Sequence, residues 1–346
     1  MKLGIIGTGK IVHEALYALK PLDQIKLKAI FARPHSEEKG RKLADEYGIE
    51  EVYTDYGKLL AQADVDTVYI GLVNSAHHAY AKQAMEAGKH VILEKPFTST
   101  LEEAEDLARV AREHDRFILE AITILHGPNY ERVRSLIPKI GRIRMLQSNY
   151  SQYSSRYTGY LKGEVAPAFD PELSGGALYD INLYNVYFAV ALLGAPKGGT
   201  YYPNLGFNGI DTSGIEILEY PDFTATLTGA KDSDSPCYTI VQGELGYIRV
   251  NGKPNVPNSI EAEYFDEAHP EGIPSPSGGI DRAMIKESFD APRLHHRMTP
   301  EFTDFARIID EGDREAAAEC INNSLTVMSL LEKSRKKAGI RFGVDR

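Results

Sequence analysis

The chain opens with short apolar runs that alternate with amphipathic segments. An apolar run from Lys2 to Ile6 leads into the glycine turn Gly7-Thr8-Gly9, and residues 11–19 then carry apolar side chains at helical spacing. The same alternation predicts strands at 25–32, 67–71, 91–93 and 117–120, and helices at 36–47 and 78–87. Strands that alternate with helices form a parallel sheet. Residues 1–122 are therefore predicted to form a doubly wound α/β domain.

After about residue 123 the pattern changes to polar and apolar alternation with hairpin turns. The pairs 215–220 with 223–228, and 238–242 with 247–250, are each joined by a short turn. This pattern is typical of a large, mostly antiparallel sheet with one face on a core. Residues 123–346 are predicted to form this second, α+β domain. Its expected helices are an apolar one from Gly176 to Leu193, one starting at Thr299, and a long one ending near Ala338. Residues 265–297 are expected to be a long excursion, rich in Pro, Gly and Ser.

The composition excludes several classes of protein. With 346 residues, 42% hydrophobic and 25% charged, the chain is long enough for two globular domains. Its formal net charge of −10 disfavours nucleic acid as a partner. No run approaches the length of a membrane span, and the first residues do not have the pattern of a signal peptide. The two cysteines, Cys237 and Cys320, fit a reducing compartment, so a cytoplasmic protein is expected.

The glycine turn is a candidate phosphate-binding site. Gly7 allows a tight turn, and Gly9 lets backbone amides at a helix amino terminus approach a pyrophosphate. Val12 stands where the usual fingerprint has a third glycine, and a plain structural turn remains the alternative. The candidate cofactor-binding residues of this segment are Gly7, Thr8, Gly9, Lys10 and Ile11.

Arg33 follows the second predicted strand, about 20 residues past the glycine turn, where an NAD-specific site usually has an acid. A guanidinium at this position suits a 2′-phosphate, which favours NADP over NAD. The alternative is an exposed arginine beside a loop.

A third signal is Glu94-Lys95-Pro96, which ends the apolar run Val91 to Leu93. In a nucleotide-binding sheet the carboxyl ends of the strands carry the chemistry. Read alone, these three residues would describe an ordinary solvated strand end.

Together these segments make the chain resemble the Gfo/Idh/MocA family of dehydrogenases along essentially its whole length. The resemblance rests on the glycine turn, on Val73-Asn74-Ser75-Ala76-His77, on the segment from Ala84 through Glu94-Lys95-Pro96, and on Gly175-Gly176-Ala177-Leu178-Tyr179-Asp180. The family usually has Pro at the position of Val73. The resemblance implies a Rossmann domain with NAD(P), with Lys95 near the nicotinamide ribose and the substrate. It also implies that Asn74, His77 and Glu94 line the cofactor cleft.

Asp180 and Tyr184 lie four residues apart, so a helix would place them on one face. An acid in such an apolar helix needs a partner. Without the resemblance, Asp180 would be a cap and Tyr184 a core residue. Many family members have His at the position of Tyr184, and tyrosine resembles the branch with glucose-fructose oxidoreductase and the dihydrodiol and D-xylose dehydrogenases. No role is assigned to the unusual Asn182.

The resulting hypothesis is hydride transfer between a nicotinamide and a carbinol carbon of a sugar, polyol or trans-dihydrodiol. Tyr184 would be the acid/base, and Lys95 would lower its pKa from about 10 to about 7, which requires about 4 kcal/mol. Asp180 would hold a substrate hydroxyl or the lysine. Tyr150, Tyr153 and Arg156 are candidates for binding hydroxyls, although surface loops carry the same residue types.

Two other functions are compatible with the sequence. One is a non-catalytic NAD(P)-binding regulator, and the other is a sugar-modifying enzyme that uses tightly held NAD for transient oxidation. The resemblance further implies a homodimer through the open face of the second sheet. No metal site is expected, because the pairs His77-His78 and His295-His296 have no third ligand at suitable spacing.

Overall fold

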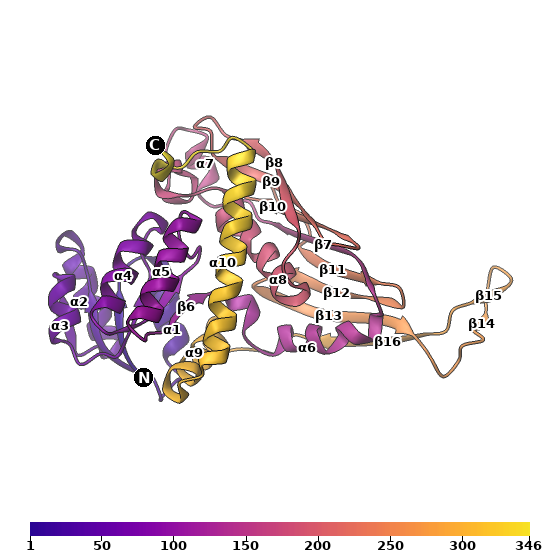
Figure 1. Cartoon of the computed structure of the whole chain (residues 1–346), viewed down its shortest axis with the longest axis horizontal. Helices are drawn as coiled ribbons and strands as arrows, with labels where there is room; N and C mark the ends of the chain where they lie inside the picture. Colours follow the sequence, from indigo (N-terminus) through magenta and orange to yellow (C-terminus); the bar gives the residue numbers. More distant parts are fainter.

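The computed structural model describes all residues, 1–346. Its first sheet is wholly parallel, with strand order β3-β2-β1-β4-β5-β6 (Figure 1). The strands are β1 (Lys2–Ile6), β2 (Lys26–Phe31), β3 (Glu51–Tyr53), β4 (Thr67–Ile70), β5 (His90–Glu94) and β6 (Ile118–Ala121). The helices between them are α1 (Lys10–Leu19), α2 (Glu37–Tyr47), α3 (Tyr56–Gln62), α4 (His77–Glu86) and α5 (Leu101–Glu113). The predicted doubly wound sheet is confirmed, and among its strands only the three-residue β3 was not expected.

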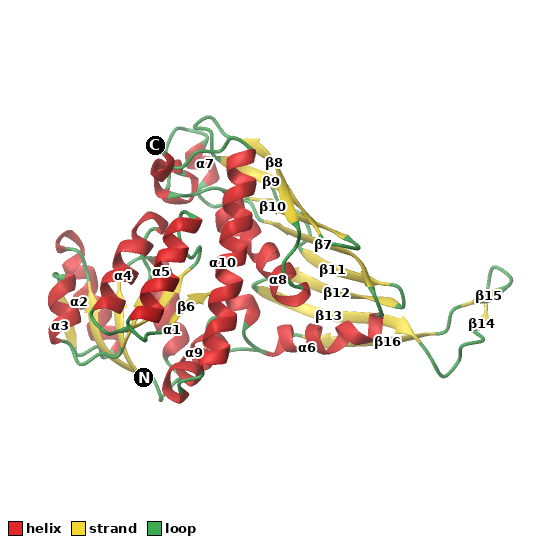
Figure 2. Ribbon diagram, viewed as in Figure 1, coloured by secondary structure: helices red, strands yellow, loops and turns green.

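The second sheet has strand order β16-β13-β12-β11-β7-β10-β9-β8 and is antiparallel except where β7 pairs with β10. Its strands are β7 (Ile143–Ser151), β8 (Gly198–Leu205), β9 (Asp211–Glu219), β10 (Thr224–Ala230), β11 (Tyr238–Gly243), β12 (Gly246–Lys253), β13 (Val256–Phe265) and β16 (Met284–Asp290). The predicted large, mostly antiparallel sheet is thus confirmed. Figure 2 shows helices on one face of it and none on the other.

The helices of the second half are α6 (Pro128–Leu136), α7 (Tyr157–Tyr160), α8 (Leu183–Leu193), α9 (Thr299–Glu311) and α10 (Arg314–Lys337). Short 3-10 turns occupy Pro34–Ser36, Asn74–Ala76, Thr123–Leu125, Ile137–Ile140, Pro167–Phe169, Pro171–Leu173 and Gly343–Asp345. Helix α10 lies between the two sheets, in contact with α5 and β6 on one side and with α8 and β8 on the other (Figure 1). None of the helices combines the length and apolarity that crossing a bilayer requires.

Helix α9 belongs to the second half of the sequence but completes the core of the first sheet. Phe302 and Phe305 of α9 are fully buried in one cluster with Leu3, Ile5 and Leu16. Burial of an aromatic side chain of this size stabilises a fold by about 1.5–3 kcal/mol. The chain therefore returns to its first sheet, and α9 brings its amino terminus close to the amino-terminal glycine turn.

Two predicted elements differ in detail. The expected helix from Gly176 to Leu193 is divided into a π-helical turn, Leu178–Asn182, and α8. The expected excursion at 265–297 contains the edge strand β16 and a two-stranded hairpin, β14 (Ile273–Pro274) and β15 (Ile280–Asp281). Figure 1 shows this hairpin projecting away from the rest of the molecule.

Candidate active site

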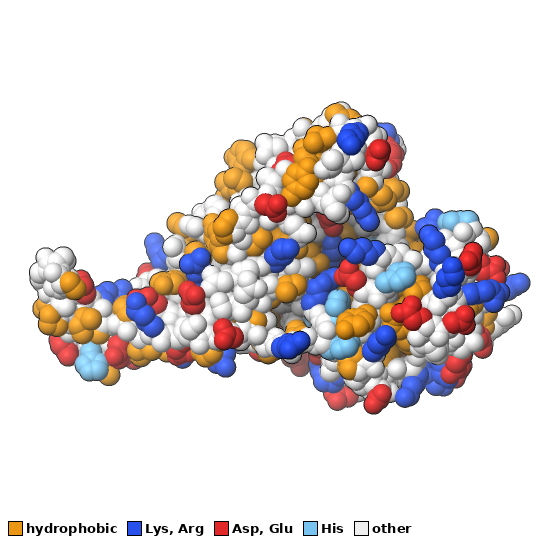
Figure 3. All heavy atoms as spheres, turned by 180° about the vertical axis from the view of Figure 1, so that it is seen from behind, with side chains coloured by type: hydrophobic (Ala, Val, Ile, Leu, Met, Phe, Trp, Pro, Cys, Tyr) orange, Lys and Arg blue, Asp and Glu red, His pale blue; other side chains and the backbone are white.

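A cleft of about 660 Å³ lies at the carboxyl ends of the parallel strands, between the two sheets. Figure 3 shows a hollow between the two lobes, with Lys and Arg side chains gathered around it. The predicted site residues that line the cleft are Gly7, Thr8, Gly9, Lys10, Ile11, Arg33, Asn74, Glu94, Lys95, Asp180 and Tyr184. The fold thus brings together residues from both halves of the sequence.

The glycine turn has the geometry that close approach of a ligand requires. Gly7 has a φ of 119°, and a Cβ there would lie 2.7 Å from the carbonyl oxygen of Gly71. A Cβ at Gly9 would meet nothing within 4 Å, so the backbone at the start of α1 faces open space. A Cβ at Gly71 would lie 2.8 Å from the side chain of Val12. Gly71, at the end of β4, therefore makes room for the valine that replaces the third glycine.

The opposite end of the cleft is built around a carboxylate held by two lysines. The Lys95 ammonium, on the loop after β5, donates to Asp180 Oδ1 at 2.8 Å and to the Asp180 carbonyl oxygen at 3.0 Å. The Lys231 ammonium lies 2.6 Å from Asp180 Oδ2. Lys95, Asp180 and Lys231 form what we call the charge triad. Two cations and one anion leave it with one net positive charge.

Coulomb attraction between the members of the charge triad keeps Asp180 and Lys95 ionised. Burial disfavours the carboxylate of Asp180, but Lys231 and Lys95 outweigh burial and hold its pKa well below the ordinary range. Burial likewise disfavours the ammonium of Lys95, but Asp180 and Tyr184 outweigh it and raise the pKa of Lys95. Both groups are therefore charged at neutral pH. Asp180 has the partner that its apolar helix demands, and it is not a proton acceptor.

Tyr184 lies beside the triad with its phenol almost buried. It is 6% exposed, the Lys95 Nζ lies 5.3 Å from its ring centroid, and the ring of Tyr150 lies 5.9 Å away. Burial raises the pKa of Tyr184 above its ordinary value, and Lys95 and Arg297 offset only part of that rise. The pKa of about 7 expected from the sequence is therefore not found. Desolvation exceeds the effect of the cations, and the phenol is neutral.

The π-helical turn places Asp180 and is fastened to the second sheet. Asp211 accepts a hydrogen bond from the Leu178 backbone at 2.6 Å. Asn182 donates to the Leu227 carbonyl oxygen at 3.0 Å and accepts from Asn185 at 2.8 Å. Asn182, for which the sequence indicated no role, thus ties the turn to β10. A π-helical turn is a frequent feature of functional sites because it changes the direction of side chains.

Of two further residues predicted from the family pattern, Glu94 lines the cleft and His77 lies behind it. Glu94 is 5% exposed, accepts a hydrogen bond from Tyr69 at 2.7 Å, and has a pKa raised by burial. His77 does not line the cleft: it is fully buried, with its ring nitrogens 2.9 Å from the Pro96 carbonyl oxygen and 3.3 Å from that of Leu72. The ring therefore braces the loop that carries Lys95, which is a structural contact.

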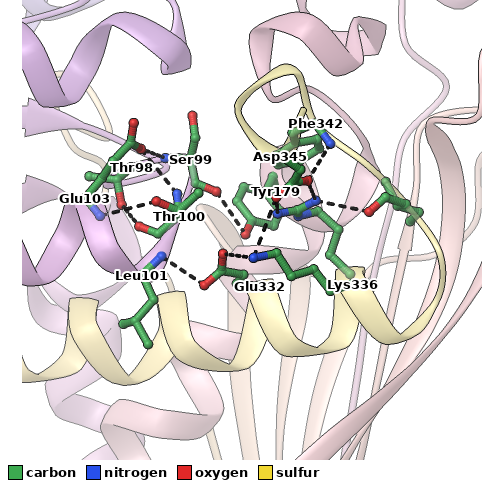
Figure 4. Close-up of polar contacts among 12 residues, drawn as sticks. Thr98, Ser99, Thr100, Leu101, Glu103, Tyr179, Glu332, Lys336, Phe342 and Asp345 are labelled. Carbon is green, nitrogen blue, oxygen red and sulfur yellow. Dashed lines mark hydrogen bonds and ion pairs between the residues drawn. The ribbon is translucent and has the colours of Figure 1, made fainter.

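A brace connects the Lys95 loop to the segment before Asp180. The Ser174 hydroxyl donates to the Ser99 hydroxyl at 2.7 Å, and the Tyr179 hydroxyl reaches the Ser99 carbonyl oxygen at 3.5 Å. On the other side Glu332 of α10 accepts from the Leu101 backbone at 3.1 Å. Figure 4 shows the contacts of Tyr179 with Ser99 and of Glu332 with Leu101, which join three distant parts of the chain.

Sequence reasoning missed four charged residues that line the cleft: Glu14, Lys231, Arg297 and Glu301. Arg297 precedes α9 and pairs with Glu14 of α1 at 2.5 Å. Glu301 is fully buried, and neither carboxyl oxygen has a hydrogen-bond partner. Nothing in the local pattern marks these residues as part of a site: Arg297 and Glu301 reach the cleft through the return of α9, and Lys231 reaches it from the end of β10. No group of three His, Cys, Asp or Glu side chains is placed to bind a metal ion.

These features fit a dinucleotide. The glycine turn leaves open space at the amino terminus of α1, and Arg33 is exposed just after β2. Glu301, which lines the cleft, has two carboxyl oxygens without a hydrogen-bond partner. The residues that would hold the dinucleotide run from Gly7 to Ile11 for the pyrophosphate, with Lys95 at the reactive end.

Known proteins define the class. The model of the oxidoreductase family with an NAD-binding Rossmann fold, GFO_IDH_MocA, matches residues 1–121. The chain is 32% identical to scyllo-inositol 2-dehydrogenase (NADP(+)) IolU of Bacillus subtilis, over 100% of this chain and 99% of that protein. It is 27% identical to the trans-1,2-dihydrobenzene-1,2-diol dehydrogenase of Xenopus tropicalis, over 75% and 78%. The crystal structure of KijD10, a 3-ketoreductase from Actinomadura kijaniata in complex with NADP and TDP-benzene, matches with a TM-score of 0.79 and 25% identity, over 97% of each chain.

The fold, the cleft and these relatives define an NAD(P)-dependent oxidoreductase that acts on CH–OH groups. The chain belongs to the Gfo/Idh/MocA family. The family resemblance and the enzyme class predicted from the sequence are both confirmed.

Proposed function

We propose that the protein transfers hydride between NADP(H) and the carbinol carbon of a sugar, polyol or trans-dihydrodiol, with Tyr184 as the proton donor and acceptor. The observation that carries the proposal is the neutral, nearly buried phenol of Tyr184 beside the positive charge triad, in a cleft shared with the glycine turn. The named relatives act on a polyol and a dihydrodiol, and KijD10 is a ketoreductase. When bound, the nicotinamide supplies the hydride chemistry.

The protonation states favour carbonyl reduction near neutral pH. A neutral phenol donates a proton to the oxygen on which negative charge develops, and the ammonium of Lys95 stabilises that charge. The reverse reaction needs the phenolate, whose fraction rises with pH because burial raises the pKa of Tyr184. Reduction should therefore be fast at neutral pH, and carbinol oxidation should increase through the alkaline range. Asp180 orients Lys95 and transfers no proton itself.

The test compares Tyr184→Phe with a control, Tyr47→Phe, which lies outside the cleft. Tyr184→Phe should lower kcat by about 10²- to 10⁴-fold on a panel of aldoses, polyols and diols, with the Kd for NADPH changed by less than about twofold. Tyr47→Phe should behave as the native chain. Parallel loss of NADPH binding and turnover in Tyr184→Phe would contradict a catalytic role. NADPH binding without turnover on any panel member would favour the regulator or the tightly-held-cofactor enzyme.

We propose Arg33 as the residue that selects NADP. It is exposed, follows β2, and lines the cleft together with His35 and Ser36. A guanidinium binds a 2′-phosphate by charge and by paired hydrogen bonds. Arg33→Ser should weaken NADPH binding about tenfold or more and leave NADH binding nearly unchanged, as followed by nicotinamide fluorescence. Equal weakening of both cofactors would refute this assignment.

We also propose a homodimer through the open face of the second sheet. Its outward-facing residues include Met145, Tyr202, Ile215 and Tyr247, each between 37% and 60% exposed. An exposed sheet face with such side chains favours association. Sedimentation should give a dimer for the native chain and a monomer for Ile215→Arg. A native monomer at micromolar concentration would refute the proposal.

A further inference from the structure

Lys231 is a buried lysine that lines the cleft and contacts Asp180 there. It follows β10, is 2% exposed, and its ammonium donates to the Ala168 carbonyl oxygen at 2.6 Å while it lies 2.6 Å from Asp180 Oδ2. It also lies 4.4 Å from the ring centroid of Phe169. The Lys231 backbone N–H donates a hydrogen bond to the Thr212 carbonyl oxygen at 2.9 Å, and its carbonyl oxygen accepts one from the Ser154 backbone N–H at 2.8 Å. The position of the ammonium is therefore set by the second sheet.

Lys231 and Lys95 share the neutralisation of Asp180, because both ammonium groups lower the pKa of that carboxylate. Asp180 already has Lys95 at 2.8 Å, so two ammonium groups share one carboxylate. A buried cation without a carboxylate of its own is costly. A neutral donor such as an amide would serve equally well to bond Ala168. The retained charge therefore requires an explanation beyond packing.

We propose that Lys231 is a positioning residue for the reaction. It occupies one oxygen of Asp180, which orients the other oxygen toward Lys95, and it supplies the positive charge that remains after Lys95 and Asp180 cancel. This inference rests on the proposed function of Tyr184 as the group that exchanges a proton with the substrate.

The surroundings of Tyr184 show why one extra cation matters. Two cations act on the Tyr184 phenol: Lys95, which follows β5, and Arg297, which precedes α9. Two acids also act on it: Glu94 of β5, and Asp180 of the π-helical turn before α8. The neutral ring of Tyr150 on β7 packs against the Tyr184 ring. Arg297 is paired with Glu14, and Lys95 with Asp180. Each of these cations is thus matched by an acid. Removal of Lys231 leaves the triad without net charge while Lys95 stays beside the phenol ring.

The first experiment measures the proton of Tyr184 directly and needs no substrate. Protein labelled with ¹³Cζ-tyrosine is titrated by NMR through the alkaline range, and Tyr184→Phe identifies the Tyr184 signal among the 20 tyrosines. Lys231→Gln removes the charge and keeps a donor for Ala168. The midpoint of Tyr184 should rise by about 0.5 to 1 pH unit in Lys231→Gln and return toward the native value in Lys231→Arg. Equal midpoints in all three proteins would overturn the proposal.

The second experiment measures turnover. In Lys231→Gln the pH midpoint of the alkaline rise in kcat for carbinol oxidation should increase by the same amount as the Tyr184 midpoint measured by NMR. The Kd for NADPH should be unchanged. Lys58→Gln, the same change at an exposed lysine of α3 outside the cleft, is the matched control and should leave the profile in place. A lower kcat with an unmoved profile would mean that Lys231 only supports the structure, and would overturn the proposal.

A third variant covers the case in which Lys231→Gln does not fold. Lys231→Ala leaves space for a small cation, and n-propylammonium should lower the Tyr184 midpoint in this variant as its concentration rises, with no effect on the native chain. An unresponsive midpoint would count against the proposal. If the native chain turns over no substrate, the proposed function fails, whereas the NMR midpoints still decide whether Lys231 acts on Tyr184.

Discussion

Replacing Asp345 by Asn should destabilise the protein through a buried ion pair at its carboxyl terminus. Asp345 is 7% exposed and its partner Arg335 is 1% exposed. Arg335 donates to both carboxylate oxygens, and the Phe342 backbone donates to one of them at 2.7 Å. Figure 4 shows this cluster packed beside Tyr179, the neighbour of Asp180. Asparagine keeps the shape of the side chain and removes its charge.

The size of the effect follows from the charge that Asp345 carries. Burial disfavours the carboxylate, but its hydrogen bonds with Arg335 and Phe342 outweigh burial and lower the pKa of Asp345 from 3.8 to about 2. At about 1.36 kcal/mol per pKa unit, this corresponds to about 2.5 kcal/mol of stability. Leaving a buried guanidinium without its carboxylate costs about 3–5 kcal/mol in other proteins, which sets the upper end.

Thermal unfolding at neutral pH measures this prediction. For a chain of 346 residues, a loss of about 2.5 kcal/mol should lower Tm by roughly 3 °C. The matched control is Asp64→Asn, which breaks the surface pair with Lys2 at 2.8 Å, where the side chains are 49% and 68% exposed. An exposed pair contributes about 0–1 kcal/mol, so the control should change Tm by only about 1.5 °C or less.

The pH dependence gives a second check. Because the pKa of Asp345 is lower in the folded chain than in the unfolded chain, its contribution is complete above about pH 4 and is lost as the pH falls toward about 2. The Tm values of the native chain and of Asp345→Asn should therefore converge in acid. A Tm drop no larger than that of Asp64→Asn, or one that stays constant down to pH 3, would refute the reasoning.

Three further changes test other parts of the structure. Gly7→Ala should lower both Tm and NADPH affinity, because the φ of 119° at Gly7 and the Gly71 carbonyl oxygen at 2.7 Å exclude a Cβ. Gly9→Ala should keep Tm and weaken NADPH binding about tenfold or more, because a Cβ there meets nothing within 4 Å. Equal Tm losses in the two variants would contradict this. Glu301→Gln should raise Tm at pH 8. Burial raises the pKa of Glu301, so unfolding at pH 8 releases its proton and is favoured by that release, which glutamine abolishes. The gain in Tm should vanish below about pH 4.5, and a gain that persists in acid would contradict this. Gly229→Ala should lower Tm and kcat together, because the new Cβ would lie 2.5 Å from the Cβ of Asn182 and displace the turn that carries Asp180. The expected cost is about 1–3 kcal/mol of stability. An unchanged kcat would show that the turn tolerates displacement.

Much of the site could be predicted from the sequence where the signal is local. Gly7 and Gly9 are marked by a strand and a helix on either side, and Lys95 by the end of an apolar strand. The family pattern placed Asp180 and Tyr184 in one segment, and both line the cleft. Each of these signals depends on residues within a few positions of one another, and short-range geometry determines them.

The properties that involve two distant segments were not available from the sequence. Asp180 was predicted to need a partner, but Lys231 lies after β10, 51 positions further along the chain, and carries no local mark. His77 was expected in the cleft and instead braces the Lys95 loop from behind. Tyr184 was expected to have a lowered pKa, and its burial reverses the direction.

By itself, the sequence determined the succession of strands and helices, the two sheets and the glycine turn, because backbone conformation follows from local periodicity and from residues such as glycine. Only the tertiary structure decided which charges meet. Lys95 and Asp180 lie 85 positions apart, and the return of α9 to the first sheet brings Arg297 to the same cleft. Desolvation and Coulomb interactions depend on distance through space and on burial, which are properties of the folded chain.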